Sequence, residues 1–163
     1  LGPLARMIGA TLQNTANPTM LTAGYKHNVV PGHAEAMVDG RFLPGFEDEL
    51  LDTIKKLIGP EVELKVLVRD KALEVDFEGP LVEAMIAAIN KFDPEGIVVP
   101  YLMSGGTDNK ALSDLGIKGY GFSPLKLPAD LDFFSLFHGV DERVPISALE
   151  FGVQVLKEFM ENA

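Results

Sequence analysis

Apolar residues that recur three and four positions apart predict three amphipathic helices along the chain. The helices cover 47–58, 80–92 and 147–162. Gly59 follows the first helix and ends it, and Pro80 suits the first turn of the second helix. Ser147 and Glu150 form a capping box at the start of the third helix. Each helix therefore has one face that has to be buried.

A second pattern, in which apolar residues alternate with polar ones or form short apolar runs, predicts five strands. They cover 19–25, 33–43, 62–68, 97–103 and 116–122. The first two strands are separated by a turn, where Pro31 removes a backbone donor. A short helix is expected from about Asp108 to Leu115, and another could be lined by Leu4, Met7, Ile8 and Leu12.

The order of these elements predicts two domains. A strand–strand–helix–strand unit comes first, which places one helix on one face of a sheet. After a change in composition at 70–79, helices and strands alternate, and this alternation predicts an α/β layer with a mostly parallel sheet. We therefore expect 1–72 and 73–163 to be separate domains.

Charge and composition exclude several kinds of partner. The net charge is −10 and the isoelectric point is near 4.7, so we expect neither nucleic acid nor anionic membranes as partners. No apolar run reaches the ~20 residues of a membrane helix, and no signal peptide is recognisable. The chain has no cysteine, which is typical of a cytoplasmic protein. It begins at Leu1 without an initiator methionine, which indicates a proteolytic or designed fragment.

His138 is the first residue that could carry chemistry. It lies in the connection 123–144, which is too long to be idle in a compact domain and also carries Phe133, Phe134 and Phe137. The imidazole could simply pack in the loop, or it could be a metal ligand oriented by the neighbouring carboxylate of Asp141 or Glu142. A catalytic zinc normally takes three protein ligands, so most of such a site would have to come from elsewhere.

Two further polar clusters are candidates for substrate binding. Gly105, Gly106 and Thr107 join a predicted strand to a helix start, where backbone amides can hold an anion, although a plain tight turn is the alternative. Asn28 and Arg41 could converge on a carboxylate or oxyanion if the turn folds back beside the strand. Otherwise Asn28 is an ordinary turn residue and Arg41 a solvated strand residue.

Three motifs in this order resemble a known family. They are Asn28-Val29-Val30-Pro31 followed thirteen residues after Asn28 by Arg41, then Ser104-Gly105-Gly106-Thr107-Asp108, then Phe137-His138-Gly139-Val140-Asp141-Glu142-Arg143-Val144. Together they resemble the C-terminal half of an M20-type metallopeptidase. That family includes acetylornithine deacetylases, succinyl-diaminopimelate desuccinylases, aminoacylases and glutamate carboxypeptidases. The resemblance runs from about Thr19 to the end of the chain.

The resemblance implies the fold and the roles of these residues. Residues 1–72 would be the second half of an α+β, ferredoxin-like lid or dimerisation domain, and 73–163 the end of an α/β zinc-peptidase catalytic domain. His138 would be the last metal ligand. Asn28 and Arg41 would bind the substrate carboxylate or carbonyl, and Gly105, Gly106 and Thr107 would line the same pocket. Two zinc ions are expected in the full enzyme, although cobalt or manganese is an open alternative.

The resemblance also implies that parts of the enzyme are absent. The early metal ligands and the general base lie in the family's N-terminal half, so we expect no catalytic residue in this chain and no activity from it alone. The full enzyme would cleave an amide bond in a small peptide or an N-acyl amino acid. We expect a homodimer through the lid, or association with the missing N-terminal half. The alternative is a non-catalytic α/β module that binds a small anion or a protein.

Overall fold

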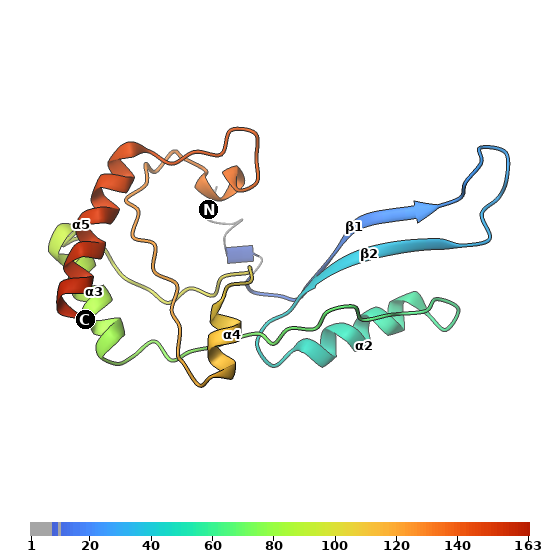
Figure 1. The fold of residues 1–163 in the computed structure, drawn as a ribbon, viewed down its shortest axis with the longest axis horizontal. Coiled ribbons are helices and arrows are strands. Elements are labelled where there is room, and N and C mark those ends of the chain that lie inside the picture. Colours follow the sequence, from blue (N-terminus) through green and yellow to red (C-terminus); the bar gives the residue numbers. More distant parts are fainter. Residues whose placement is uncertain (1–7, 10) are drawn as a thin grey trace. The chain divides into compact units, whose positions relative to one another are not determined.

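A computed structural model of the chain describes residues 8, 9 and 11–163. The chain folds as two compact units, one spanning Gly9–Leu73 and the other built mainly from Glu74–Ala163. The elements are β1 (Thr15–Ala23), β2 (Ala34–Arg41), α2 (Glu47–Ile58), α3 (Pro80–Phe92), α4 (Asn109–Asp114), the 3-10 helix η1 (Phe133–Leu136) and α5 (Ile146–Asn162) (Figure 1). The predicted helix near the N-terminus lies largely outside the described residues.

An antiparallel hairpin of β1 and β2 forms the sheet of the first unit. The register places Thr15 opposite Arg41 at the base of the hairpin, and a bulge at Thr19 shifts the pairing midway. The hydroxyl of Thr19 donates to the carbonyl oxygen of Met37 at 3.4 Å. The two predicted strands and the turn between them are therefore confirmed, with β1 beginning four residues earlier than predicted. The loop 24–33 joins them.

Helix α2 covers the residues that the sequence predicts. Acidic residues occupy its first turn and lysines its last, an arrangement that complements the helix dipole. Gly59 ends the helix with φ 73° and donates its amide to the carbonyl oxygen of Lys55 at 3.2 Å. Leu50 is the buried residue of α2, and a Cβ on Gly40 of β2 would lie 3.3 Å from its side chain. This close contact packs α2 against the hairpin.

The predicted strand at 62–68 is wrong. The segment is extended but pairs with no other strand among the described residues, and its apolar side chains stay exposed. Alternation favours a strand only where a second strand supplies hydrogen-bond partners. Side chains at the start of α2 bind the residues that follow this segment. Asp48 accepts from Arg69 at 2.9 Å, and Glu47 accepts from the backbone amide of Ala72 at 3.5 Å.

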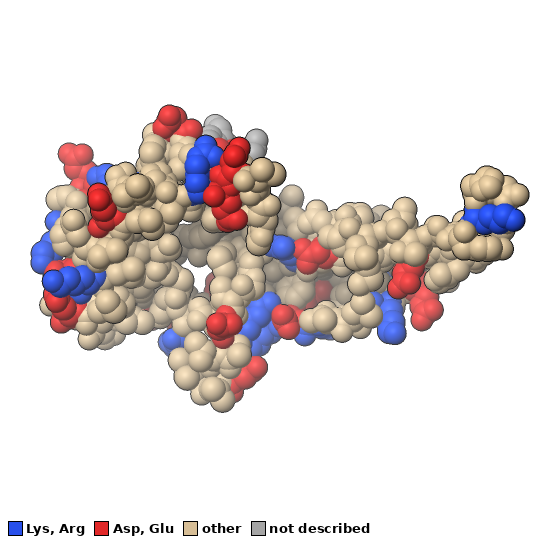
Figure 2. Space-filling model, turned by 45° about the horizontal axis from the view of Figure 1, so that its top comes forward, with Lys and Arg blue, Asp and Glu red and all other residues tan. Residues whose placement is uncertain are grey.

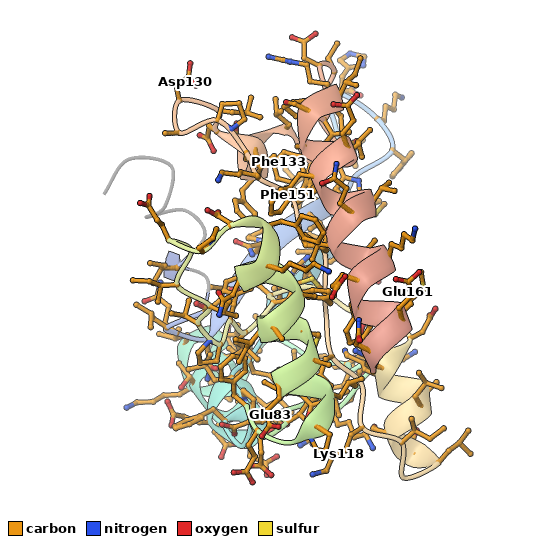
Figure 3. The ribbon with its side chains drawn as sticks, turned by 90° about the vertical axis from the view of Figure 1, so that its left-hand side faces the viewer. Glu83, Lys118, Asp130, Phe133, Phe151 and Glu161 are labelled. Carbon is orange, nitrogen blue, oxygen red and sulfur yellow. The ribbon has the colours of Figure 1, made fainter. Side chains whose placement is uncertain are left out.

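Helices α3 and α5 form the core of the second unit. They lie side by side in Figures 1 and 3, although most of the unit's chain separates them in sequence. The buried residues are Val82, Met85 and Ala88 on α3 and Ala148, Gly152 and Val155 on α5. Three of these residues, Ala88, Ala148 and Gly152, have at most a methyl group as side chain, which favours close packing of the two helices. Two ion pairs, Lys91 with Glu158 and Lys126 with Asp93, lie at the surface around this core.

The start of α5 differs from the prediction. The helix begins at Ile146, and its N-cap is Pro145, which makes no side-chain capping bond. The carbonyl oxygen of Pro145 accepts from the amides of Ala148 and Leu149 at 3.1 and 3.2 Å. Ser147 therefore lies inside the first turn, and the predicted capping box is wrong because its serine stands two residues past the cap.

The mostly parallel sheet is also wrong for the described residues, in which the sheet has two antiparallel strands. The segments 97–103 and 116–122 are not strands. Ile97 and Val99 are 88% and 65% exposed, so these apolar side chains are not buried in a core. In the described residues, their segment also pairs with no other strand. The short helix is confirmed as α4. The α+β character of the first unit stands, because its hairpin is followed by a helix.

The surface mixes charged and uncharged residues. On the face drawn in Figure 2, acidic and basic side chains are interspersed, with uncharged residues over most of the area between them. Large apolar side chains of α5 and of the segments 62–68 and 97–103 are among the exposed residues. Within the described part of the chain, no helix has the length and apolar character that crossing a bilayer requires.

Candidate functional site

The loop that carries His138 begins with an aromatic cluster. In η1 the side chain of Asp132 accepts from the amide of Ser135 at 3.3 Å, and the Ser135 hydroxyl donates to the Asp132 carbonyl oxygen at 2.8 Å. The rings of Phe133, Phe134 and Phe137 meet edge to face, with centroids 5.1 to 6.1 Å apart. Such aromatic pairs contribute beyond the area that they bury, so the cluster fixes the chain immediately before the histidine.

His138 itself has an unusual backbone conformation. Its φ is 58°. Among the residues that the structure describes, every other residue with a positive φ is a glycine. The amide of Gly139 donates to the carbonyl oxygen of Leu136 at 2.9 Å and closes a tight turn around the histidine. A Cβ on residue 139 would lie 3.0 Å from that same carbonyl oxygen. A side chain at 139 would therefore crowd this turn, and His138 within the turn is exposed at the surface.

The carboxylates near His138 do not complete a metal site. Within the described residues, no group of three or more His, Cys, Asp or Glu side chains lies close enough to hold an ion. The carbonyl oxygen of Asp141 accepts from Arg143 Nη1 at 2.9 Å, and the amide of Glu142 donates to Gly139. A catalytic zinc needs three protein ligands, so these residues do not fit a resident metal by themselves.

The glycine turn lies just before α4. Gly105, Gly106 and Thr107 are all exposed, and the Thr107 carbonyl oxygen accepts from the amide of Lys110 at 3.2 Å. Asp108 is the N-cap of α4 but makes no side-chain capping bond. The residues of this turn are open to solvent, but a helix as short as α4 has little dipole to add to the binding of an anion.

Asn28 and Arg41 are not brought together by the hairpin. Asn28 lies in the exposed turn of the loop 24–33, whereas Arg41 ends β2 at the base of the hairpin. Eight residues of β2 separate that loop from the base, which corresponds to about 25 Å of strand. Arg41 Nε donates to Asp39 Oδ2 at 2.8 Å. Within one hairpin the amide and the guanidinium therefore cannot contact one small group.

A pocket that sequence reasoning missed lies next to the His138 loop. It has a volume of about 540 Å³, and its walls come from the connection 122–125, from η1 with Phe137, from 142–144 and from α5. Its apolar wall is formed by Phe122, Phe133, Phe137, Leu149, Val153 and Leu156, among others. Figure 3 shows Phe133 in η1 beside the first turns of α5. In the sequence, the aromatic residues of the long connection were the only sign of this pocket. They did not indicate the shape that these residues form together.

Partial burial changes the chemistry of one side chain outside these clusters. Desolvation raises the pKa of the Tyr101 phenol above its ordinary value of 10.0, because the charged phenolate loses hydration there. Tyr101 belongs to the extended segment that leads to the glycine turn. This phenol therefore stays protonated throughout the physiological pH range and can act there as a hydrogen-bond donor.

Comparisons with known proteins place the chain in a family. Residues 3–65 match the model of the peptidase dimerisation domain, M20_dimer. The chain is 31% identical to the mouse N-fatty-acyl-amino acid synthase/hydrolase PM20D1 over 94% of its length, and 29% identical to the human protein of that name over 96%. It is 26% identical over 85% of its length to a probable carboxypeptidase S-like 2 of Dictyostelium discoideum.

The matches cover most of the chain but only part of each relative. The chain spans 31%, 32% and 27% of the lengths of these three proteins. No solved structure matches it significantly. The dimerisation-domain match includes β1, β2 and α2, and the similarity to the relatives continues through most of the second unit. The chain therefore belongs to the M20-type peptidase family, whose members include amide-bond hydrolases.

Proposed function

We propose that the chain is part of a zinc-dependent hydrolase that cleaves an amide bond in a small peptide or an N-acyl amino acid. The observation that carries the proposal is the similarity to N-fatty-acyl-amino acid synthase/hydrolases along 94% of the chain. The carboxypeptidase-like relative supports the same bond type, since peptides and N-acyl amino acids both present an amide next to a carboxylate.

Within this proposal, His138 is one ligand of the metal centre. Its exposed imidazole, set by the turn at Gly139, is available to a metal that other parts of the complete enzyme also bind. The remaining ligands and the general base belong to residues beyond the described ones, because these contain no three-ligand cluster. The chain by itself is therefore proposed to be inactive.

Substrate contacts are assigned to the other two clusters. The exposed turn of Gly105, Gly106 and Thr107 offers backbone amides to the substrate carboxylate. Asn28 and Arg41 offer an amide and a guanidinium, and a guanidinium can bind a carboxylate through two parallel hydrogen bonds. Because one hairpin holds Asn28 and Arg41 far apart, both can reach one substrate only if they come from different copies of the chain.

A homodimer would supply that second copy. In the described residues β1 and β2 pair only with each other, so each has an outer edge with unused backbone donors and acceptors. Such edges pair readily with another chain, and the matching domain is named for dimerisation. We therefore propose a homodimer through the first unit.

Native mass spectrometry of the purified protein with its metal retained tests this proposal. A complex that contains this chain, further polypeptide and two zinc ions, and that hydrolyses N-acyl amino acids, supports it. In that complex His138→Ala is expected to lose one metal and activity together, whereas Val140→Ala, a change at a fully exposed neighbour, is expected to keep both. A species made only of this chain, without metal or activity in any assembly, would instead favour a non-catalytic binding module.

A further inference from the structure

The short helix η1 lies between Asp132 and His138 and is fixed at both ends. At its start, Oδ1 of the half-buried Asp132 accepts from the amide of Ser135 at 3.3 Å. At its end, the carbonyl oxygen of Leu136, the last residue of η1, accepts from the amide of Gly139 at 2.9 Å. The turn that contains His138 is therefore built directly on the end of η1.

The two ends of η1 are coupled because the helix is very short. It has four residues, which is about one turn of a 3-10 helix, so it has no interior that would stay ordered if one end opened. The ring of Phe133, which follows the cap, also meets the ring of Phe137, which precedes the histidine, with centroids 5.1 Å apart. A change at the start of η1 is therefore expected to reach the turn around His138.

The backbone of His138 needs such support. Its φ of 58° lies in a region that residues with a side chain rarely occupy, and such a conformation persists where the surrounding structure determines it. Among the described residues, neither Asp141 nor Glu142 forms a side-chain hydrogen bond or ion pair with the imidazole. The support therefore comes from the other side of the histidine, where η1 lies.

We propose that Asp132 is a positioning residue for His138. Its carboxylate holds the start of η1 through the amide of Ser135, and η1 in turn holds the left-handed backbone from which the imidazole projects. Asp132 acts through the backbone, whatever the imidazole binds in the complete protein. Its consequence for hydrolysis rests on the proposed function, in which His138 belongs to the active site.

Hydrogen exchange in the 163-residue chain, followed by nuclear magnetic resonance, tests the positioning without an assay of hydrolysis. Asp132→Ala removes the acceptor for Ser135 and is expected to make the Gly139 amide exchange about fivefold faster, as the loss of an N-cap does in other helices. Asp132→Asn keeps an oxygen acceptor and should restore the slow exchange. Asp130→Ala is the matched control, because Asp130 is exposed in the same loop (Figure 3).

The amide of Val155 separates a local effect from general damage to the fold. Val155 is fully buried on α5, so its amide reports the stability of the core of the second unit. Faster exchange at Gly139 in Asp132→Ala, with unchanged exchange at Val155, supports the proposal. Equal acceleration at both amides overturns it, since Asp132 would then only stabilise the fold. Unchanged exchange at Gly139 overturns it as well.

In the complete hydrolase, the same variants connect the turn to activity. Asp132→Ala is expected to lower kcat for an N-acyl amino acid at least about threefold, because a small displacement of an active-site group slows the reaction strongly. KM should change little, since no substrate contact is removed, and Asp132→Asn should restore kcat.

The outcomes separate this inference from the proposed function. Hydrolysis that is unaffected by Asp132→Ala, although exchange at Gly139 responds, overturns the role of Asp132 in catalysis and leaves the proposed function standing. If no assembly of the protein hydrolyses an amide, the proposed function fails, and the exchange rates at Gly139 and Val155 still decide whether Asp132 positions His138.

Discussion

The side chain of Asn14 forms a hydrogen bond with the backbone of Leu43. The Oδ1 atom of Asn14 accepts from the amide of Leu43 at 2.9 Å, and its Nδ2 donates to the carbonyl oxygen of Phe46 at 3.2 Å. One side chain just before β1 thus satisfies both ends of the turn between β2 and α2. This turn determines where α2 starts against the hairpin, because the amide of Leu50 in α2 donates to the same Phe46 carbonyl oxygen.

Removing this side chain is expected to destabilise the first unit. Asn14→Ala loses both hydrogen bonds and should lower the free energy of unfolding by about 1–3 kcal/mol, since each contributes ~1 kcal/mol. Asn14→Asp keeps the acceptor for Leu43 and loses the donor to Phe46, so its effect should be smaller. Urea denaturation followed by circular dichroism measures both variants. Equal stability of the alanine variant and the unchanged chain would contradict this role.

Gly152 lies where α5 comes close to the connection at Pro124. A Cβ at 152 would lie 2.8 Å from the carbonyl oxygen of Pro124. Gly152→Ala is therefore expected to destabilise the second unit by about 1–3 kcal/mol, as overpacking does elsewhere. Gly121→Ala is the matched control, because nothing lies within 4 Å of a Cβ there. Thermal unfolding measures the stability of both variants. If Gly121→Ala were less stable than Gly152→Ala, the packing argument would be refuted.

The backbone at His138 stores a small amount of strain. A left-handed conformation costs a residue with a side chain roughly 1–2 kcal/mol, and glycine avoids that cost. His138→Gly is therefore expected to keep or raise the stability of the second unit while it removes the imidazole. Gly139→Ala should lower stability, because its Cβ would meet the Leu136 carbonyl oxygen. Denaturant titrations of both variants provide the measurement, and a strongly destabilised His138→Gly protein would show that the imidazole itself supports the fold.

The raised pKa of Tyr101 predicts a loss of stability in alkali. The folded state holds the phenol proton more tightly than the unfolded state, whose pKa is near 10.0. The stability from this difference is complete below pH 10 and is lost as pH rises through the folded-state pKa. In ultraviolet titration of the phenolates, Tyr101→Phe should remove a component that ionises above the ordinary pKa of 10.0, whereas Tyr25→Phe should leave that component. Identical late titration in both variants would exclude the assignment.

If the complete protein is the homodimeric hydrolase proposed above, the separation of Asn28 and Arg41 within one copy predicts complementation between subunits. If each site takes Asn28 from one copy and Arg41 from the other, Asn28→Ala and Arg41→Ala homodimers are both inactive. A random mixture of the two variants should then recover about a quarter of wild-type activity per subunit, because half of the dimers contain one intact site. Complete absence of activity in the mixture would mean that both residues act within one copy.

The helices could be predicted closely from the sequence because local residues determine their ends. Gly59 ends α2 and Pro80 begins α3, and the structure places both ends as predicted. The start of α5 moved to Ile146 because Pro145 provides the cap through its backbone, which the pattern of Ser147 and Glu150 conceals. The local sequence pattern therefore predicts a helix correctly even where the predicted first residue of the helix is wrong.

The strands predicted for the second unit are absent from the described residues, because a strand is not determined by its own sequence alone. Ile97 and Val99 have strand propensity, but a strand also needs a neighbour, and neighbours are not encoded in the segment itself. The site shows the same limit. The turn around His138 follows from Gly139, whereas the distance from Asn28 to Arg41 depends on hairpin register, and the pocket depends on four segments that meet only in the folded unit.

The pairing of α3 with α5 makes the intervening chain a tether. The two helices contact each other although α3 ends at Phe92 and α5 begins at Ile146, and the connection between them includes His138. While it is intact, the connection holds the helices at a high effective concentration, which for a flexible link is in the millimolar range. A single cut near His138 would turn their contact into a bimolecular one. Dilution would then separate α5 from α3. The hydrophobic core of the second unit therefore stays intact only while the loop that carries His138 is uncut.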